Sequence, residues 1–396
     1  MHCRPVRPWT RLRDRPTDRY SHRHSHRPSH PRRSQARWLT LPAALLLAAG
    51  CNPFVQQLAV PVSQWPGYEF FPLAHARNLD RREGLKLQLP VFANPQDIVH
   101  AYLRGDVQIA QLTTVEAVDL CKRVPKRCPV VVLVLDESRG GDQVLVHRSL
   151  ASIAKLRGKP VAITPSTLGP FVLSRALARH GLGLGDVDLR PMPLETMPQA
   201  LARGEVVAAA LFPPFSEEAQ RLAPVRPLFT SREIPGEIFD VLVVDPGVLS
   251  RQRPALVRLL RTWQAAQNEL RRDPQASIAV MARREGVSEA DFRASLQGLV
   301  FLPLERQQPL FRSGGVLERN LRDLRQVQAQ LGLMPATGGS TAFAKAQGAA
   351  MGGTAGRTAR TAMISGFFNT ASTAAIRDKV KAMMLLQTLQ LSQMVQ

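Results

Sequence analysis

Acidic residues, cysteines and aromatic residues are all scarce in this sequence, and the shortages exclude several kinds of site. Asp and Glu total 31 against 52 Lys and Arg in 396 residues. The four cysteines form no CxxC pair, and no Cys/His cluster has the spacing of a metal site. No Ser/His/Asp arrangement is suggested either. We therefore expect no metal, no cofactor and no catalytic residue.

The formal charge of +21 is spread unevenly along the chain. Residues 1–50 hold eleven Arg, no Lys and two Asp, a net +9, so the remainder carries 41 basic and 29 acidic residues, a net +12. In that remainder no block of Lys and Arg is interleaved with aromatic residues. A nucleic-acid partner is therefore not expected. A basic surface facing anionic lipid or cell wall is the simpler interpretation.

A short apolar run follows the basic leader. Residues 38–50 contain about a dozen apolar residues, too few to span a ~30 Å hydrocarbon core but typical of a signal peptide. The stretch Leu47-Ala48-Ala49-Gly50-Cys51 resembles the lipobox of bacterial lipoproteins. That resemblance implies that residues 1–50 are a signal peptide and that Cys51 is lipidated, which anchors the protein to a membrane. The alternative is a buried helix that ends in a core cysteine.

One structural unit occurs twice in the chain. Residues 101–114 read as the end of a helix, a glycine stop at Gly105 and a buried strand that ends at Thr113-Thr114. Residues 200–214 repeat this order around Gly204 and end at Pro213-Pro214. Two such units predict two similar α/β lobes. The carboxyl ends of their strands would meet at a shared cleft, where open α/β sheets bind ligands.

Other turns that follow predicted strands supply candidate ligand contacts. Trp65 and Tyr68 flank the turn Pro66-Gly67 and would be aromatic walls of the cleft, while Glu69 lies in the first turn of the next helix. The alternative is that Trp65 packs beneath the loop and Glu69 only caps the helix. Asn94 is an N-cap that could also offer its amide to a ligand.

Motifs taken in chain order resemble one family. They are Trp65-Pro66-Gly67-Tyr68, Arg104-Gly105-Asp106-Val107, residues 112–117, Asp136-Glu137-Ser138 with Gly141-Asp142, residues 156–161 and residues 164–169. Over roughly residues 56–335 the chain resembles the solute-binding proteins of nitrate, sulfonate and taurine-type ABC importers, which include the pyrimidine-precursor binders of thiamine supply. The resemblance implies an α/β type II periplasmic-binding-protein fold, in which two lobes joined by two crossing strands close on a solute.

The resemblance also implies limits for the domains. The crossings would fall near residues 143–148 and 239–244. Lobe one would then comprise residues 52–146 and 243–335, and lobe two residues 147–242. Residues 336–396 lie outside the pattern: the first part is rich in Gly, Ala, Thr and Ser and reads as a flexible linker, and 374–396 has apolar positions that suit a terminal helix. A partner-binding helix, a membrane-surface helix and an unstructured end all remain open for this tail.

The sequence departs from the family pattern at three places. Gln108 and Val207 stand where the family usually has Asp, and Phe212-Pro213 stands where an acid-Pro pair is common. The missing acid near Pro213 predicts a more apolar pocket on lobe two. Cys121 and Cys128 flank Pro125, so a disulfide between them is possible in an oxidising compartment.

Together these features predict a periplasmic, lipid-anchored solute receptor that partners an ABC permease and closes two lobes on a small molecule. Acids in the cleft favour an amine or N-heterocycle, such as a pyrimidine, whereas Ser- and Thr-rich helix starts favour an anion such as a sulfonate. The alternatives are a receptor for a signalling partner and, with less support, a pyrimidine-synthase-like enzyme. The predicted ligand contacts are Trp65, Tyr68, Glu69, Asn94, Thr113, Thr114, Asp136, Ser138, Asp142, Ser166, Thr167 and Pro214.

Overall fold

The computed structural model describes residues 56–331. The predicted signal peptide 1–50, the lipidation site Cys51 and the tail 336–396 lie outside these residues. Within the described part, no helix is both long and apolar enough to cross a bilayer.

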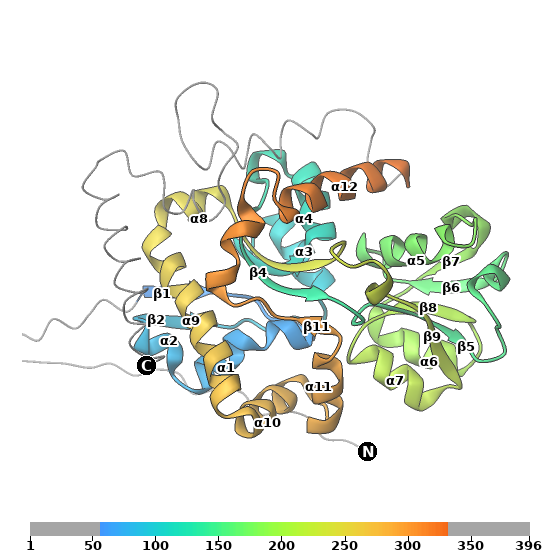
Figure 1. The fold of residues 1–396 in the computed structure, drawn as a ribbon, viewed down its shortest axis with the longest axis horizontal. Coiled ribbons are helices and arrows are strands. Elements are labelled where there is room, and N and C mark those ends of the chain that lie inside the picture. Colours follow the sequence, from blue (N-terminus) through green and yellow to red (C-terminus); the bar gives the residue numbers. More distant parts are fainter. Residues whose placement is uncertain (1–55, 332–396) are drawn as a thin grey trace, which may run out of the picture. The chain divides into compact units, whose positions relative to one another are not determined.

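Lobe one is built on two sheets (Figure 1). The smaller pairs β1 (Gln56–Ala59) with β2 (Leu85–Gln88) in parallel, and the bridge between Val62 and Val91 extends this pairing. The larger has the order β11–β4–β10–β3, formed by β3 (Ile109–Thr113), β4 (Val130–Ser138), β10 (Phe239–Val244) and β11 (Leu299–Val300). Every residue of β3, β4 and β10 is buried, as their apolar runs predict.

Lobe two is built on one sheet of five strands in the order β7–β6–β8–β5–β9. Its strands are β5 (Gln143–His147), β6 (Pro160–Ile163), β7 (Asp188–Pro191), β8 (Ala208–Leu211) and β9 (Val225–Thr230). β6 is parallel to β7 and β8, whereas β5 is antiparallel to both of its neighbours, β8 and β9.

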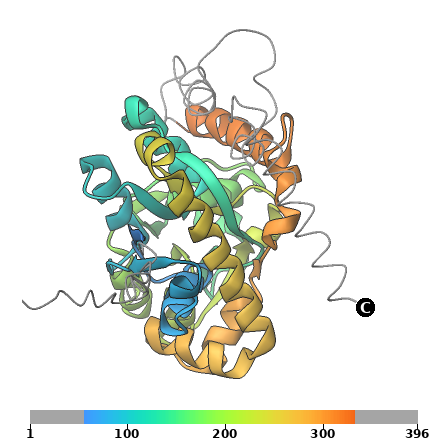
Figure 2. The ribbon, with the colours of Figure 1, turned by 90° about the vertical axis from the view of Figure 1, so that its left-hand side faces the viewer.

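Helices pack on these sheets in both lobes. Lobe two carries α5 (Leu168–Ala178), α6 (Met197–Ala202) and α7 (Phe215–Leu222). Lobe one carries α1 (Phe70–Ala76), α2 (Leu79–Arg82), α3 (Pro95–Arg104), α4 (Thr114–Arg123), α8 (Pro246–Arg251), α9 (Arg253–Arg272), α10 (Pro274–Glu285), α11 (Glu289–Leu296) and α12 (Val316–Gln330). Figure 2 shows the blue first segment of lobe one beside the yellow helix α9. Trp263 of α9 is fully buried there, with its ring 5.9 Å from that of Phe70.

Local sequence signals set the ends of the helices beside the cleft. Gly105 ends α3 with φ +88°, the left-handed conformation that favours glycine. The side chain of Asn94 caps α3 by accepting the Asp97 N–H at 3.1 Å. Thr113 caps α4 in a capping box with Glu116. The predictions of the Gly105 stop, the Asn94 cap and the Thr113 turn are confirmed.

The connections between the lobes differ from the sequence prediction. β5 lies wholly in the sheet of lobe two and β10 wholly in that of lobe one, so the predicted limits at 146/147 and 242/243 are wrong by a few residues. The chain passes between the sheets in segments 139–142 and 231–238 instead. The reason is physical: apolar strands are needed inside the sheets, where both faces are buried, and the glycine-containing segments between the strands can make the connection.

The two connecting segments are hydrogen-bonded to each other. The Ser231 hydroxyl accepts the Gly140 N–H at 2.7 Å and pairs with the Ser138 hydroxyl at 2.8 Å. The Asp142 N–H donates to Ser138 Oγ at 3.2 Å. Ser138, predicted as a ligand contact, therefore joins the two connections.

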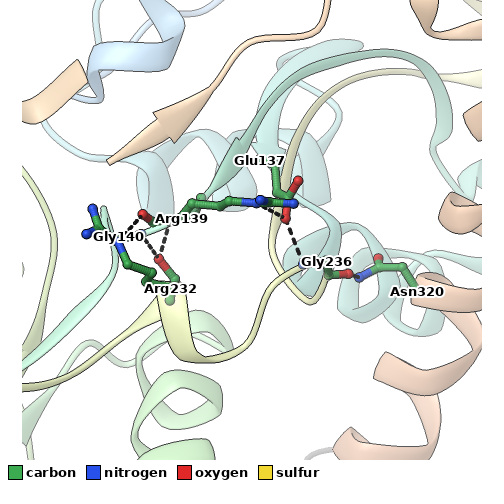
Figure 3. Close-up of polar contacts among 8 residues, drawn as sticks. Glu137, Arg139, Gly140, Arg232, Gly236 and Asn320 are labelled. Carbon is green, nitrogen blue, oxygen red and sulfur yellow. Dashed lines mark hydrogen bonds and ion pairs between the residues drawn. The ribbon is translucent and has the colours of Figure 1, made fainter. Parts of the chain in front are cut away.

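Lobe one holds the second connection through Glu137 and Asn320 (Figure 3). A Glu137 carboxylate oxygen accepts Arg139 Nε and the Gly236 N–H, both at 2.8 Å. The Asn320 amide in α12 donates to the carbonyls of Gly236 and Glu237, both at 2.9 Å. A change in the angle between the lobes must therefore break or rearrange some of these hydrogen bonds.

The cysteine pair is bonded. Cys121 at the end of α4 and Cys128 before β4 form a disulfide across seven positions of sequence. Both residues are buried. The disulfide that the sequence allowed is therefore present in the structure.

Candidate functional site

A cavity of about 300 Å³ lies between the lobes. It is lined by Trp65, Tyr68, Ala93, Asn94, Pro95, Gln96, Asp97, His100, Thr113, Glu116, Asp142, Thr164, Pro165, Ser166, Leu168, Pro193, Leu194, Glu195, Phe212 and Asp240. The volume is at the lower end of the range for small-molecule sites.

The lobes touch each other beside this cavity. The Gln96 amide in the first turn of α3 donates to the Pro165 carbonyl in the β6–α5 loop at 2.8 Å. Arg221 of α7 lies 3.3 Å from the Asp291 carboxylate of α11, a second contact between the lobes. Two side-chain contacts therefore join the lobes, and the first lies at the cavity wall, since Gln96 and Pro165 both line the cavity.

Three aromatic rings form one side of the cavity. The Trp65 and Phe212 rings meet edge to face with centroids 5.5 Å apart and an interplanar angle of 84°. Tyr68 lies 6.4 Å from Trp65 at 58°. Trp65 and Tyr68 come from lobe one and Phe212 from lobe two, so this wall spans the interface. Aromatic faces suit a planar heterocycle or a cation.

The charges that line the cavity are of one sign. Among residues 56–331, five acidic residues and no Lys or Arg line it, although the whole chain has 52 Lys and Arg against 31 acids. The five are Asp97, Glu116, Asp142, Glu195 and Asp240. Within residues 56–331, no three His, Cys, Asp or Glu side chains are placed to hold a metal ion. The lining is therefore complementary to an organic cation.

Burial raises the pKa of the deeper acids to different extents. The pKa of Glu116 rises to about 7 because burial disfavours its charge, although hydrogen bonds from Thr113 oppose the shift. The pKa of Asp142 rises to about 6 by burial, against a hydrogen bond with Ser138. At neutral pH Asp142 is therefore mostly ionised and Glu116 about half ionised.

Asp136 and Asp240 form the deepest acidic group, beneath Trp65 and Tyr68. Tyr68 donates its hydroxyl to Asp240 Oδ1 at 2.6 Å, and Trp65 Nε1 donates to Asp136 Oδ2 at 3.4 Å. Burial raises the pKa of Asp136 to about 7 and that of Asp240 well above its ordinary value. Gly67 is required above this group, because a Cβ at position 67 would lie 1.9 Å from Asp136 Oδ2.

The structure brings six of the twelve predicted contact residues to the cavity wall: Trp65, Tyr68, Asn94, Thr113, Asp142 and Ser166. They come from several separate turns at strand ends, as expected for ligand sites in such sheets. Their role as solute contacts stays a prediction.

The other six predicted residues do not line the cavity. Asp136 and Ser138 are fully buried and are not part of its lining. Glu69 is fully buried in an ion pair with Arg284, and Thr167 is a buried residue at the start of α5. Thr114 Oγ1 accepts the Phe239 N–H at 3.4 Å. Pro214 lies at a separate, smaller cavity between α7 and α11.

Sequence reasoning missed Glu116, Asp240 and Phe212. Glu116 carried a signal, since a Thr three positions before a Glu is a capping box, but that pattern predicts only a helix start. Phe212 was noted as a departure from the family, and the expected apolar character of lobe two agrees with its lining residues Pro165, Leu168, Leu194 and Phe212. Nothing local marked Asp240, which lies at a β-strand start 98 residues beyond Asp142.

Two α/β lobes, two short connections and a cavity between them define the type II periplasmic-binding-protein fold. The chain belongs to the NMT1-like family, whose model matches residues 55–284.

Its relatives are distant in sequence. The taurine-binding periplasmic protein of Escherichia coli is 24% identical over 293 residues, 71% of this chain and 89% of that protein. A binding protein of Brucella abortus is 21% identical over 258 residues, 64% of this chain and 79% of the relative. In three dimensions, the alkanesulfonate-binding protein of Xanthomonas axonopodis pv. citri matches with a TM-score of 0.58 at 18% identity, over 70% of this chain and 94% of that one. At this identity the structural match establishes the fold.

Proposed function

We propose that this protein is the extracytoplasmic solute-binding component of an ABC importer, and that its solute carries a protonated amine or a basic N-heterocycle. The observation that carries the proposal is the cavity between the lobes, whose lining in the described part of the chain has five carboxyl groups, three aromatic rings and no Lys or Arg. A sulfonate or nitrate would bring a negative charge next to those carboxyls. Such like-charge placement in a desolvated site is strongly unfavourable.

Asp142 is the best candidate for the ion pair with the solute. It is only 2% exposed, lies on the connection between the lobes and has a pKa of about 6, so it is charged at neutral pH. Trp65 and Phe212 then cover the apolar part of the solute from opposite lobes. Contacts to both lobes are made only when the lobes are closed, which is how a solute shifts the population toward the closed state.

The test is a binding screen on the purified protein by native mass spectrometry and thermal shift. We expect amines and N-heterocycles, including aminopyrimidines, to raise the melting temperature and sulfonates to have no effect. Asp142→Asn should weaken binding of the best cation by about 10- to 100-fold, the loss of one charged hydrogen bond worth about 1.5–3 kcal/mol. Glu195→Gln, a change at the exposed rim, should cost less than about fivefold. Tight binding of sulfonates, or cation binding that ignores Asp142→Asn, would refute the proposed solute class.

We also propose that Cys51 carries a lipid anchor on the periplasmic face of a bacterial membrane. The support is the lipobox-like sequence before it and the extracytoplasmic class of the fold. A multiply acylated cysteine gains about 0.8 kcal/mol for each buried CH₂, so release should be negligible. In fractionated cells we expect the protein in the membrane fraction and Cys51→Ala in the soluble fraction, whereas Cys121→Ala should leave the fractionation unchanged. Membrane association of Cys51→Ala would contradict the anchor.

A further inference from the structure

Two buried aspartates face each other on neighbouring strands at the base of the cavity. Asp240 of β10 and Asp136 of β4 are partners in the antiparallel register, and their side chains are on the same face. Asp136 is 0% exposed and Asp240 1% exposed. Only Asp240 lines the cavity.

Each carboxyl has one oxygen with a hydrogen-bond donor and one without. Trp65 Nε1 donates to Asp136 Oδ2, and the Tyr68 hydroxyl donates to Asp240 Oδ1. Asp136 Oδ1 and Asp240 Oδ2 are buried and have no partner when both groups are ionised. A buried acceptor without a donor is unfavourable, because it has lost the hydrogen bonds that water would give it. A proton held between the two carboxyls gives both oxygens a partner at once.

The surroundings of the pair also favour retention of a proton. The negative charge of Asp142, in the segment that connects the lobes, raises the pKa of both aspartates, and the charge of Glu137 of β4 raises that of Asp136. Glu116 of α4 and Tyr68 lie near as well, and on the far side of β10 the register partner of Asp240 is the neutral Thr113. The strongest charged influences on the pair are therefore acids, and like charges in a buried site cannot all ionise.

We propose that Asp136 and Asp240 share one proton in the solute-free protein and release it to solvent when a cation enters the cavity. This inference rests on the proposed cationic solute. The positive charge of the solute replaces that of the proton beside Asp240, so the site exchanges one cation for another and its net charge stays constant. Asp136, which does not line the cavity, is a positioning residue that acts through Asp240.

Infrared spectroscopy tests the shared proton without any ligand. At about pH 7, the double variant Asp136→Asn/Asp240→Asn should lack the C=O stretch of one carboxylic acid relative to the wild type, because the pair holds one proton between two groups. Each single variant should lack the C=O stretch of at most one carboxylic acid relative to the wild type. Asparagine matches the shape of aspartate and can still bond with Trp65 or Tyr68, so folding should be kept. A loss of two carboxylic acids in the double variant, or of none, would overturn the shared proton.

Calorimetry tests the exchange. N-methylpyridinium is a suitable probe because its charge does not titrate. Binding is measured at about pH 7 in phosphate and in HEPES, whose ionisation enthalpies differ and neither of which is a net cation, and the difference gives the protons released per cation. We expect the double variant to release about one proton fewer than the wild type, and Asp136→Asn to release fewer as well. The wild-type affinity should rise by up to about tenfold per pH unit while the pair is protonated.

Glu285→Gln is the matched control, since Glu285 is a buried acid with a raised pKa outside the cavity. It should leave proton release unchanged. Equal proton release in the wild type and the double variant would overturn the exchange while leaving cation binding, and so the proposed function, intact. If neither this probe nor any amine binds at any pH, the solute class and the exchange both fail, and the infrared comparison decides separately on the shared proton.

Discussion

Replacing Arg284 with methionine is expected to lower the free energy of unfolding by about 3–5 kcal/mol, because the change leaves a buried acid without its partner. Arg284 of α10 makes two hydrogen bonds to Glu69: Nε donates to Oε2 at 2.5 Å, and a second guanidinium nitrogen donates to the other carboxylate oxygen. Its guanidinium also donates to the Ser63 carbonyl at 2.8 Å. Glu69 is 0% exposed, and even with Arg284 present burial holds its pKa at about 7. Urea denaturation should show the loss, with a fall in Tm on the order of 10 °C.

Two further variants separate the buried pair from a general loss of positive charge. Arg203→Met removes an arginine whose partner Glu205 is exposed, and it should leave the denaturation midpoint unchanged. Glu69→Met/Arg284→Met removes both charges and should recover much of the stability, since apolar groups of similar volume can replace a buried ion pair. Equal midpoints for Arg284→Met and Arg203→Met would show that the ion pair contributes little.

The role of Glu69 illustrates what the sequence can predict. The turn Pro66-Gly67 and the helix after it follow from local patterns, and the structure agrees. The side chain of Glu69 was placed in the cleft or at a helix cap on the same local grounds. Its partner Arg284 lies 215 positions later, on a helix whose last turn has two adjacent arginines, Arg283 and Arg284. No spacing rule selects one of them, so the pairing depends on the tertiary packing of α10 against α1.

The residues of the cavity also include some that the sequence predicts and some that it does not. Asp142 and Thr113 were predictable because each lies at a turn at the end of a strand, where the backbone sets the position. Asp240 was not, because it begins a strand and its meaning depends on register: β10 places it opposite Asp136. The lobe boundaries failed for a related reason, since hydrophobic runs indicate strands without indicating which sheet they join. Local chemistry thus predicts turns and caps, and pairings between strands need the fold.

Stability is expected to fall as the pH rises from about 5 to about 8, the reverse of ordinary acid denaturation. The pKa of Glu116 is about 7 in the folded protein against an ordinary value of 4.5, and Glu69, Asp136 and Asp142 are raised in the same direction. Between these values the folded state holds protons that the unfolded chain has lost. The stabilisation by these bound protons is complete below about pH 4.5 and is lost as the pH rises past about 7. For one carboxyl with such a shift, the free energy of unfolding falls by about 2.5 kcal/mol between pH 5 and 8.

Two carboxyls with lowered pKa oppose this trend only weakly. Asp186, held by the Gly183 N–H, and Glu205, held by Arg203, lie at the surface, where solvent screens their interactions. The buried acids therefore determine how steeply the free energy of unfolding changes with pH. Because they share protons and influence one another, their contributions add to less than the sum of single groups.

Glu116→Gln tests the assignment on one residue. Glutamine keeps the capping box with Thr113 but does not ionise. Between pH 5 and 8, the free energy of unfolding of the variant, measured by urea denaturation, should therefore fall by about 2 kcal/mol less than that of the wild type. At pH 8 it should be the more stable of the two proteins, since it avoids a buried charge. Glu305→Gln changes an exposed carboxyl and should reproduce the wild-type slope. A wild type that gains stability toward pH 8 would mean that water reaches these acids, and a cavity that admits water so freely would discriminate poorly between cations and anions.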